Sequence, residues 1–125
     1  MPAGSANQSL KGAITALNKL NSLANAVEVV STQIIKTVSA TGTPEALAAD
    51  ATYFRSAVIV AKKAARTANT GNVYLGIGAT NDTQPYEIAP GDVLSIKADP
   101  GTKMDLNDWY LDVLNAGDGV AVIYS

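Results

Sequence analysis

Apolar residues recur every three or four positions between Asn7 and about Val27. Side chains at this spacing lie on one face of a helix, so the pattern predicts an amphipathic α-helix, with Ser5 or Asn7 as its N-cap. The predicted stripe spans about three heptads, which is too short for an independent coiled coil. We therefore expect it to be buried against its own domain, against copies of itself or against another protein. The stripe is formed by Leu10, Ile14, Leu17, Leu20, Ala24 and Val27.

Beyond Val29 the pattern changes to short β-branched runs separated by turn residues. Such runs predict strands. We expect strands near 34–40, 45–49, 53–63, 71–77, 85–88, 92–98, 107–114 and 119–124. The turn at 89–92 and the turn at 99–101 carry Pro-Gly pairs typical of type II turns. The turn at 116–119 is expected to join the last two strands as a hairpin.

The segment 55–69 is rich in alanine and lysine, which leaves a helix as an alternative there. We favour a strand over 54–61 because Val58, Ile59 and Val60 form a β-branched core run. This many short strands predict a mainly β chain, folded as an antiparallel β-sandwich or small jelly-roll-like barrel preceded by an N-terminal α-helix. The expected division is a helical oligomerisation or docking segment at 1–32 and a β domain at 33–125.

Length and composition fit one ordinary domain. The chain has 125 residues, of which 47% are hydrophobic and 16% charged, and its formal net charge is −2. This balance excludes intrinsic disorder. Residues 1–70 hold seven cations and three carboxylates, a net charge of +4, and residues 71–125 hold two cations and eight carboxylates, a net charge of −6. This polarity could help copies to pack, but we favour an interpretation in which both halves enter one domain and their charges mix on its surface.

The chain contains no histidine and no cysteine. It therefore has no disulfide framework, no thiolate nucleophile, no zinc site of the usual ligand types and no histidine acid or base. We expect no enzyme, no catalytic residue, no cofactor and no resident metal. The glycine pair at 76–78 lacks the third glycine and the helix of a dinucleotide site. Asp105, Asp108 and Asp118 could hold an adventitious cation, but we favour Asp105 and Asn107 as caps of a turn.

Carboxylates beside an aromatic ring are the pattern that sugar-hydrolysing and sugar-binding sites use. Asp108 and Asp112 are expected to alternate on one face of the strand predicted at 107–114, with Tyr110 between them. We favour an ordinary exposed polar face over a glycosidase site. The opposite, buried face of this strand would consist of Trp109, Leu111 and Val113.

The one basic cluster, at Lys62, Lys63 and Arg66, has no interleaved aromatics, and the sequence pI is about 4.8. These features predict a solvated strand end or a contact with an acidic protein neighbour rather than nucleic-acid binding. No basic segment followed by an apolar run opens the sequence, and the apolar run at 57–61 is too short to cross a bilayer. We expect a soluble chain made in a cytoplasm, with no membrane contact.

Four segments form a recognisable series: TGNVYLG at 70–76, PYEIAPGD at 85–92, DLNDWYLD at 105–112 and GDGVAVIY at 117–124. The series resembles a small β domain found in virion structural proteins of tailed bacteriophages and prophages, including head decoration (cement) and head-fibre proteins. The resemblance covers roughly residues 40–125. It implies a β-sandwich or jelly-roll-like domain, often trimeric, seated on the capsid lattice. It carries over no catalytic residue, because those proteins share no active site.

The resemblance implies a capsid decoration protein on the outer surface of a phage head. Its partners would be itself, as a homotrimer, and the major capsid protein, with no nucleic acid, membrane or small-molecule substrate. The alternative is a tail, head-fibre or adhesin-type module that binds a cell-surface carbohydrate, with Tyr110 beside Asp108 and Asp112. We assign the oligomer or capsid interface to Leu10, Ile14, Leu17, Leu20 and Val27.

Overall fold

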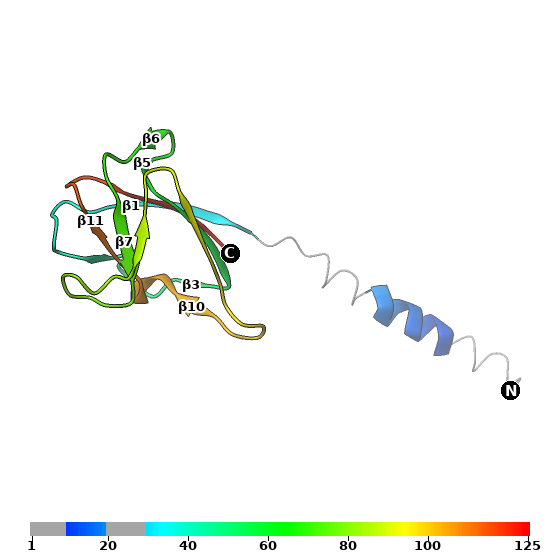
Figure 1. Cartoon of the computed structure of the whole chain (residues 1–125). Helices are drawn as coiled ribbons and strands as arrows, with labels where there is room; N and C mark the ends of the chain where they lie inside the picture. The colour runs from blue at the N-terminus through cyan, green and yellow to red at the C-terminus, as the bar shows by residue number, and fades with distance from the viewer. Residues whose placement is uncertain (1–9, 20–29) are drawn as a thin grey trace, which may run out of the picture. The chain divides into compact units, whose positions relative to one another are not determined.

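The computed structural model describes residues 10–19 and 30–125 and divides into two compact units, Met1–Val30 and Ser31–Ser125 (Figure 1). In the first unit, residues 10–19 form an α-helix, which confirms this part of the predicted helix. The remainder of that prediction, including Leu20 and Val27, lies outside the described residues. Within the described ranges, no helix has the length and apolar character needed to cross a membrane.

The second unit is built of antiparallel strands, as the short β-branched runs predict. Sheet A has the order β1 (Thr32–Thr37), β12 (Gly119–Tyr124), β4 (Ser56–Val60) and β9 (Val93–Lys97). Sheet B has the order β2 (Glu45–Ala46), β11 (Tyr110–Val113), β7 (Val73–Gly76) and β8 (Tyr86–Ile88). Two short pairs complete the unit: β3 (Tyr53–Phe54) with β10 (Met104–Asp105), and β5 (Lys62–Ala64) with β6 (Thr67–Ala68).

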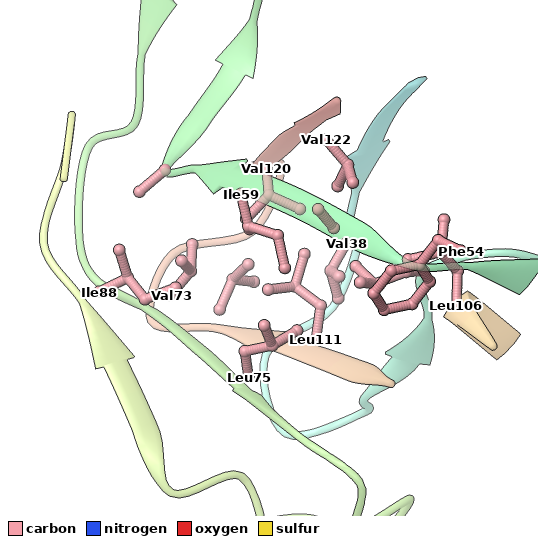
Figure 2. Close-up of a cluster of buried hydrophobic side chains, with 14 residues drawn as sticks. Val38, Phe54, Ile59, Val73, Leu75, Ile88, Leu106, Leu111, Val120 and Val122 are labelled. Carbon is pink, nitrogen blue, oxygen red and sulfur yellow. The ribbon is translucent and has the colours of Figure 1, made fainter. Parts of the chain in front are cut away.

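One hydrophobic cluster receives side chains from both four-stranded sheets. Ile59 and Val122 come from sheet A, whereas Leu75 and Leu111 come from sheet B, and all four are fully buried. Figure 2 shows these side chains converging between the strands. Burying each of them stabilises the fold by about 1.5–3 kcal/mol. The strand preferred over a helix at 54–61 is confirmed, because β4 supplies Ile59 to this core.

Two of the predicted turns have the geometry that their Pro-Gly pairs favour. The Asp92 N–H donates to the Ala89 carbonyl at 2.9 Å, and Gly91 between them has φ +82°. The Thr102 N–H likewise donates to the Asp99 carbonyl at 2.9 Å, across Gly101. A glycine with positive φ at the third position, after proline, is the signature of a type II turn. These turns enter and leave β9.

The predicted hairpin at 116–119 is wrong. β11 pairs with β2 and β7 in sheet B, whereas β12 pairs with β1 and β4 in sheet A. The turn between these strands therefore carries the chain from one sheet to the other. It contains Gly117 with φ +88°, so its turn residues were recognised correctly but their topological role was not.

Asp118 anchors this crossing and does not face solvent. Its side chain is 1% exposed, and its carboxylate accepts hydrogen bonds from the N–H groups of Thr70 and Gly71 and from the Thr70 hydroxyl. The cation-ligand alternative for Asp118 is therefore wrong, because main-chain donors of another segment occupy its oxygens.

Candidate interaction surfaces

The helix of the first unit exposes the apolar stripe that its periodicity predicts. Leu10, Ile14 and Leu17 are 60%, 50% and 57% exposed. Their spacing of four and three residues places them on one helix face. Three of the five residues assigned to an interface thus form a continuous exposed apolar stripe in the described helix. Leu20 and Val27, the other two, lie outside the described residues.

Sheet A presents an apolar side to solvent as well as to the core. Strand register aligns Ile35, Ala121, Val60 and Val93 in one cross-strand row and Gln33, Ile123, Val58 and Ser95 in the next. We call this surface the outer face of sheet A. Its apolar residues are Ile35, Val58, Val60, Val93, Ala121 and Ile123.

Four of these residues are substantially exposed, from Val58 at 38% to Val93 at 56%. An antiparallel sheet with one face toward water ordinarily alternates apolar and polar residues, so that the solvent face is polar. Here the solvent side carries isoleucine and valine in adjacent rows. Exposed apolar residues gathered on one sheet face make that face a candidate interaction surface.

A hollow of about 240 Å³ opens at one end of the outer face of sheet A. Val60, Ala121 and Ile123 provide its apolar wall, and the β5–β6 hairpin contributes Lys62 and Ala65. We call it the sheet A hollow; Gln33 completes its lining. It joins an apolar surface to the basic cluster that the sequence shows at Lys62, Lys63 and Arg66.

Charge is segregated between the two sheets. The strands of sheet A contain two lysines and no carboxylate, whereas those of sheet B contain three carboxylates and no cation. The β5–β6 hairpin adds Lys62 and Lys63, with Arg66 in its turn. The expectation that both halves of the sequence enter one domain is confirmed, because each sheet contains strands from 1–70 and from 71–125, and Asp92 and Asp99 lie in the turns flanking β9 of the lysine-bearing sheet. A single ion pair, Lys36 with Glu45 at 3.1 Å, links the two sheets in the described part of the chain.

A cleft of about 470 Å³ lies beside the β3–β10 pair. We call it the β3–β10 cleft; it is lined by Tyr53, Ile77, Lys103, Met104, Asp105, Asp108 and Trp109. Ile77 is 73% exposed, the largest exposure of any big apolar side chain in the second unit. The Lys103 ammonium lies 4.0 Å from the centroid of the Tyr53 ring, and Trp109 lies 6.5 Å from the Tyr86 ring at a tilted angle.

The predicted pairing of Asp108 with Asp112 on one strand face is wrong. β11 begins only at Tyr110, and Asp108 belongs to a 3₁₀ helix, η1 (Leu106–Asp108). Asp112 is 7% exposed, and its Oδ1 accepts the N–H groups of Gly42 and Val113 at 3.0 and 2.8 Å. A carboxylate held in this way fixes a loop and does not form an exposed acidic face beside Tyr110.

Of the other predictions made for residues near β11, some are confirmed and one is not. Leu111 and Val113 are buried, as predicted, whereas Trp109 precedes the strand and packs only partly against the core. Asp105 is confirmed as a cap, because its carboxylate accepts the Asn107 N–H at 2.9 Å and the Thr52 N–H at 2.8 Å. In the described part of the chain, no three carboxylates cluster in a way that could hold a metal ion.

The sequence analysis singled out the charged residues of these two sites, Lys62 in the hollow and Asp105 and Asp108 in the cleft, but not the apolar residues beside them. Ile77 looked like the end of a predicted strand, and Ala121 and Val60 looked like ordinary strand residues. The one sequence signal for these apolar residues is that three strands carry apolar side chains at consecutive positions. Such a strand has apolar residues on both of its faces, as strands buried on both sides do.

Together these features describe an antiparallel β domain with an apolar outer face on sheet A and a cleft of mixed character beside β3 and β10, and a helix whose apolar residues share one side. Comparison of the chain with protein-family models, with curated proteins and with solved structures finds no match. The function is therefore argued from the surfaces themselves.

Proposed function

We propose that this chain is a virion structural protein, a capsid decoration (cement) protein of a tailed bacteriophage. It binds the outer surface of the head as a homotrimer and bridges neighbouring subunits of the major capsid protein, which stabilises the shell. The observation that carries the proposal is the outer face of sheet A, an exposed apolar surface on a well-packed domain. The resemblance of residues 40–125 to head decoration and head-fibre domains supplies the class of partner.

The proposed fold is a β-sandwich. Two four-stranded antiparallel sheets that send side chains into one cluster supply what such a sandwich requires. The loops between the sheets are held by buried side chains, for example Asp118 on Thr70 and Asp112 on Gly42. A domain whose loops are fixed in this way suits the proposed role of linking neighbours on a pressurised shell.

The helix stripe supplies a second adhesive element in the proposal. Leu10, Ile14 and Leu17 are each at least half exposed. Burying each of them in a trimer interface or against the capsid contributes about 1.5–3 kcal/mol. Contacts of this size are weak singly, but they add up through avidity when three copies engage one lattice.

The test uses phage heads stripped of their decoration. Purified chain is expected to cosediment with such heads and to raise the temperature at which they release DNA. Leu17→Lys is expected to abolish binding, whereas Asn18→Lys, on the polar side of the same helix, retains it. A well-folded chain that remains monomeric and shows no affinity for heads would overturn the proposal.

The second candidate is a carbohydrate-binding fibre or adhesin module, and the β3–β10 cleft is the observation that favours it. Trp109 and Tyr53 lie there beside Asp105 and Asp108, a combination of aromatic and acidic groups that suits a sugar. However, the Lys103 ammonium already covers one face of Tyr53, which reduces the ring available for stacking. Glycan-array retention that Tyr53→Ala abolishes would establish this function, and no retention on any glycan would exclude it.

A further inference from the structure

We propose that β domains of neighbouring copies associate head to tail, with Ile77 of one copy entering the sheet A hollow of the next. The proposal rests on the self-association proposed above and names the surfaces that meet. Both surfaces belong to every copy, so each copy offers one projecting side chain and one hollow.

Shape is the first argument. Ile77 is 73% exposed at the edge of the β3–β10 cleft, although a branched aliphatic side chain gains most when removed from water. The sheet A hollow offers about 240 Å³ with an apolar wall of Val60, Ala121 and Ile123. Strong interface contacts are made by side chains that enter well-packed pockets closed to water, and the hollow would give Ile77 such a pocket.

Charge is the second argument, and it selects a second copy in this orientation. The hollow is bordered by Lys62, and the same hairpin carries Lys63 and Arg66. The cleft beside Ile77 is bordered by Asp105 and Asp108, of which Asp108 is exposed. A head-to-tail contact therefore brings lysines toward carboxylates. A contact between the hollows of two copies would instead bring their two cationic hairpins together, which is unfavourable.

The cleft also contains a cation, Lys103, but its ammonium is held 4.0 Å from the Tyr53 ring centroid. The ring's negative face partly balances that charge in place. The negative charge of Asp108, beside Ile77, can therefore attract the cationic β5–β6 hairpin of the neighbouring copy.

The position of the two surfaces is the third argument. Figure 1 shows the β5–β6 hairpin at one end of the second unit and the β3–β10 pair at the other. A contact that joins different surfaces is heterologous, and it closes into a ring when the rotation between copies permits. A ring of three copies would leave no hollow empty and no Ile77 exposed.

The chain has no cysteine, so engineered thiols can report the contact without background. We would prepare full-length Ile77→Cys and, separately, Ala65→Cys, which places a thiol on the hairpin at the hollow. Mixed under mild oxidation, the two variants are expected to form a disulfide-linked dimer at least about ten times faster than either variant alone, because contact raises the effective thiol concentration. Ala116→Cys, at another exposed turn, is the matched control for Ala65→Cys.

Three results would overturn the head-to-tail geometry. They are rapid linkage of Ile77→Cys to itself, linkage to Ala116→Cys as fast as to Ala65→Cys, and no linkage in the mixture. Binding to stripped heads is measured on the same samples. Cross-linking without head binding would refute the decoration function and leave the geometry standing, whereas head binding without cross-linking would refute the geometry alone.

Discussion

The side-chain amide of Asn69 pairs with the main chain of Gly119 in both directions. Its Nδ2 donates to the Gly119 carbonyl at 2.7 Å, and its Oδ1 accepts the Gly119 N–H at 3.0 Å. Asn69 thus acts like one residue of an additional strand at the start of β12. On the other side of Gly119 lies β1, so close that a Cβ on Gly119 would overlap the Lys36 carbonyl oxygen.

Asn69→Ala is expected to lower the free energy of unfolding by about 2–4 kcal/mol, because it leaves a buried N–H and a buried carbonyl of Gly119 without partners. Urea unfolding followed by tryptophan fluorescence measures the loss. Asn72→Ala is the matched control, since the Asn72 side chain makes only an exposed hydrogen bond, to Glu87, and its loss should cost no more than about 0.5 kcal/mol. Equal midpoints for the two variants would contradict the structural role of Asn69.

Gly12→Ala should strengthen the helix at 10–19. A Cβ at Gly12 meets no atom within 4 Å, and alanine is favoured over glycine in a helix interior by about 0.5–1 kcal/mol. Slower amide hydrogen exchange over residues 10–19 is the expected readout. Ala16→Gly, the reverse change in the same helix, should accelerate that exchange, and unchanged exchange in both variants would refute the assignment of a helix there.

Substitutions at two neighbouring residues of β12 should affect different properties, one the self-association of the chain and the other its stability. Ile123 is 45% exposed on the outer face of sheet A, so Ile123→Thr should leave the unfolding free energy within about 0.5 kcal/mol of the parent. Its self-association, measured by sedimentation velocity, should weaken. Val122 is fully buried, and Val122→Thr buries a hydroxyl at a cost of about 1–3 kcal/mol. A loss of stability at Ile123 as large as that at Val122 would show that Ile123 belongs to the core.

Charge exchange tests the polarity of the contact between copies. Lys62→Glu and Asp108→Lys should each slow the cross-linking of the Ile77→Cys and Ala65→Cys pair about three- to tenfold, because each places like charges together. The cross-linking rate should recover when the Ala65→Cys variant carries Lys62→Glu and the Ile77→Cys variant carries Asp108→Lys, because opposite charges then face each other again. Equal rates in all combinations, or rates insensitive to salt, would rule out the electrostatic part of the argument.

Local chemistry made most of the elements predictable. The β-branched run at Val58–Val60 gave β4, and the Pro-Gly pairs gave the turns around β9. The apolar spacing gave the helix at 10–19. These features depend on a few neighbouring residues, whose propensities agree with the fold they enter.

Features that depend on pairing between distant segments were not predictable. The turn at 116–119 has hairpin residues, but whether two strands pair or enter different sheets is decided by their remote partners. Asp112 was placed on a polar face because alternation ignores the loop at Gly42 that covers it. The sheet A hollow combines residues from β1, β4, β5 and β12, so its existence follows from topology and not from any one stretch of sequence.

The central position of β12 in sheet A has a consequence for assembly. β1 pairs only with β12, and their register joins Thr32 to Tyr124, so this edge of the sheet cannot form until the far end of the chain has folded back. Such non-local pairing is slow to form. The wall of the hollow includes Ala121 and Ile123, both from β12. A copy in which β12 is misfolded loses these two wall residues, so under the head-to-tail proposal it would not accept Ile77 of its neighbour.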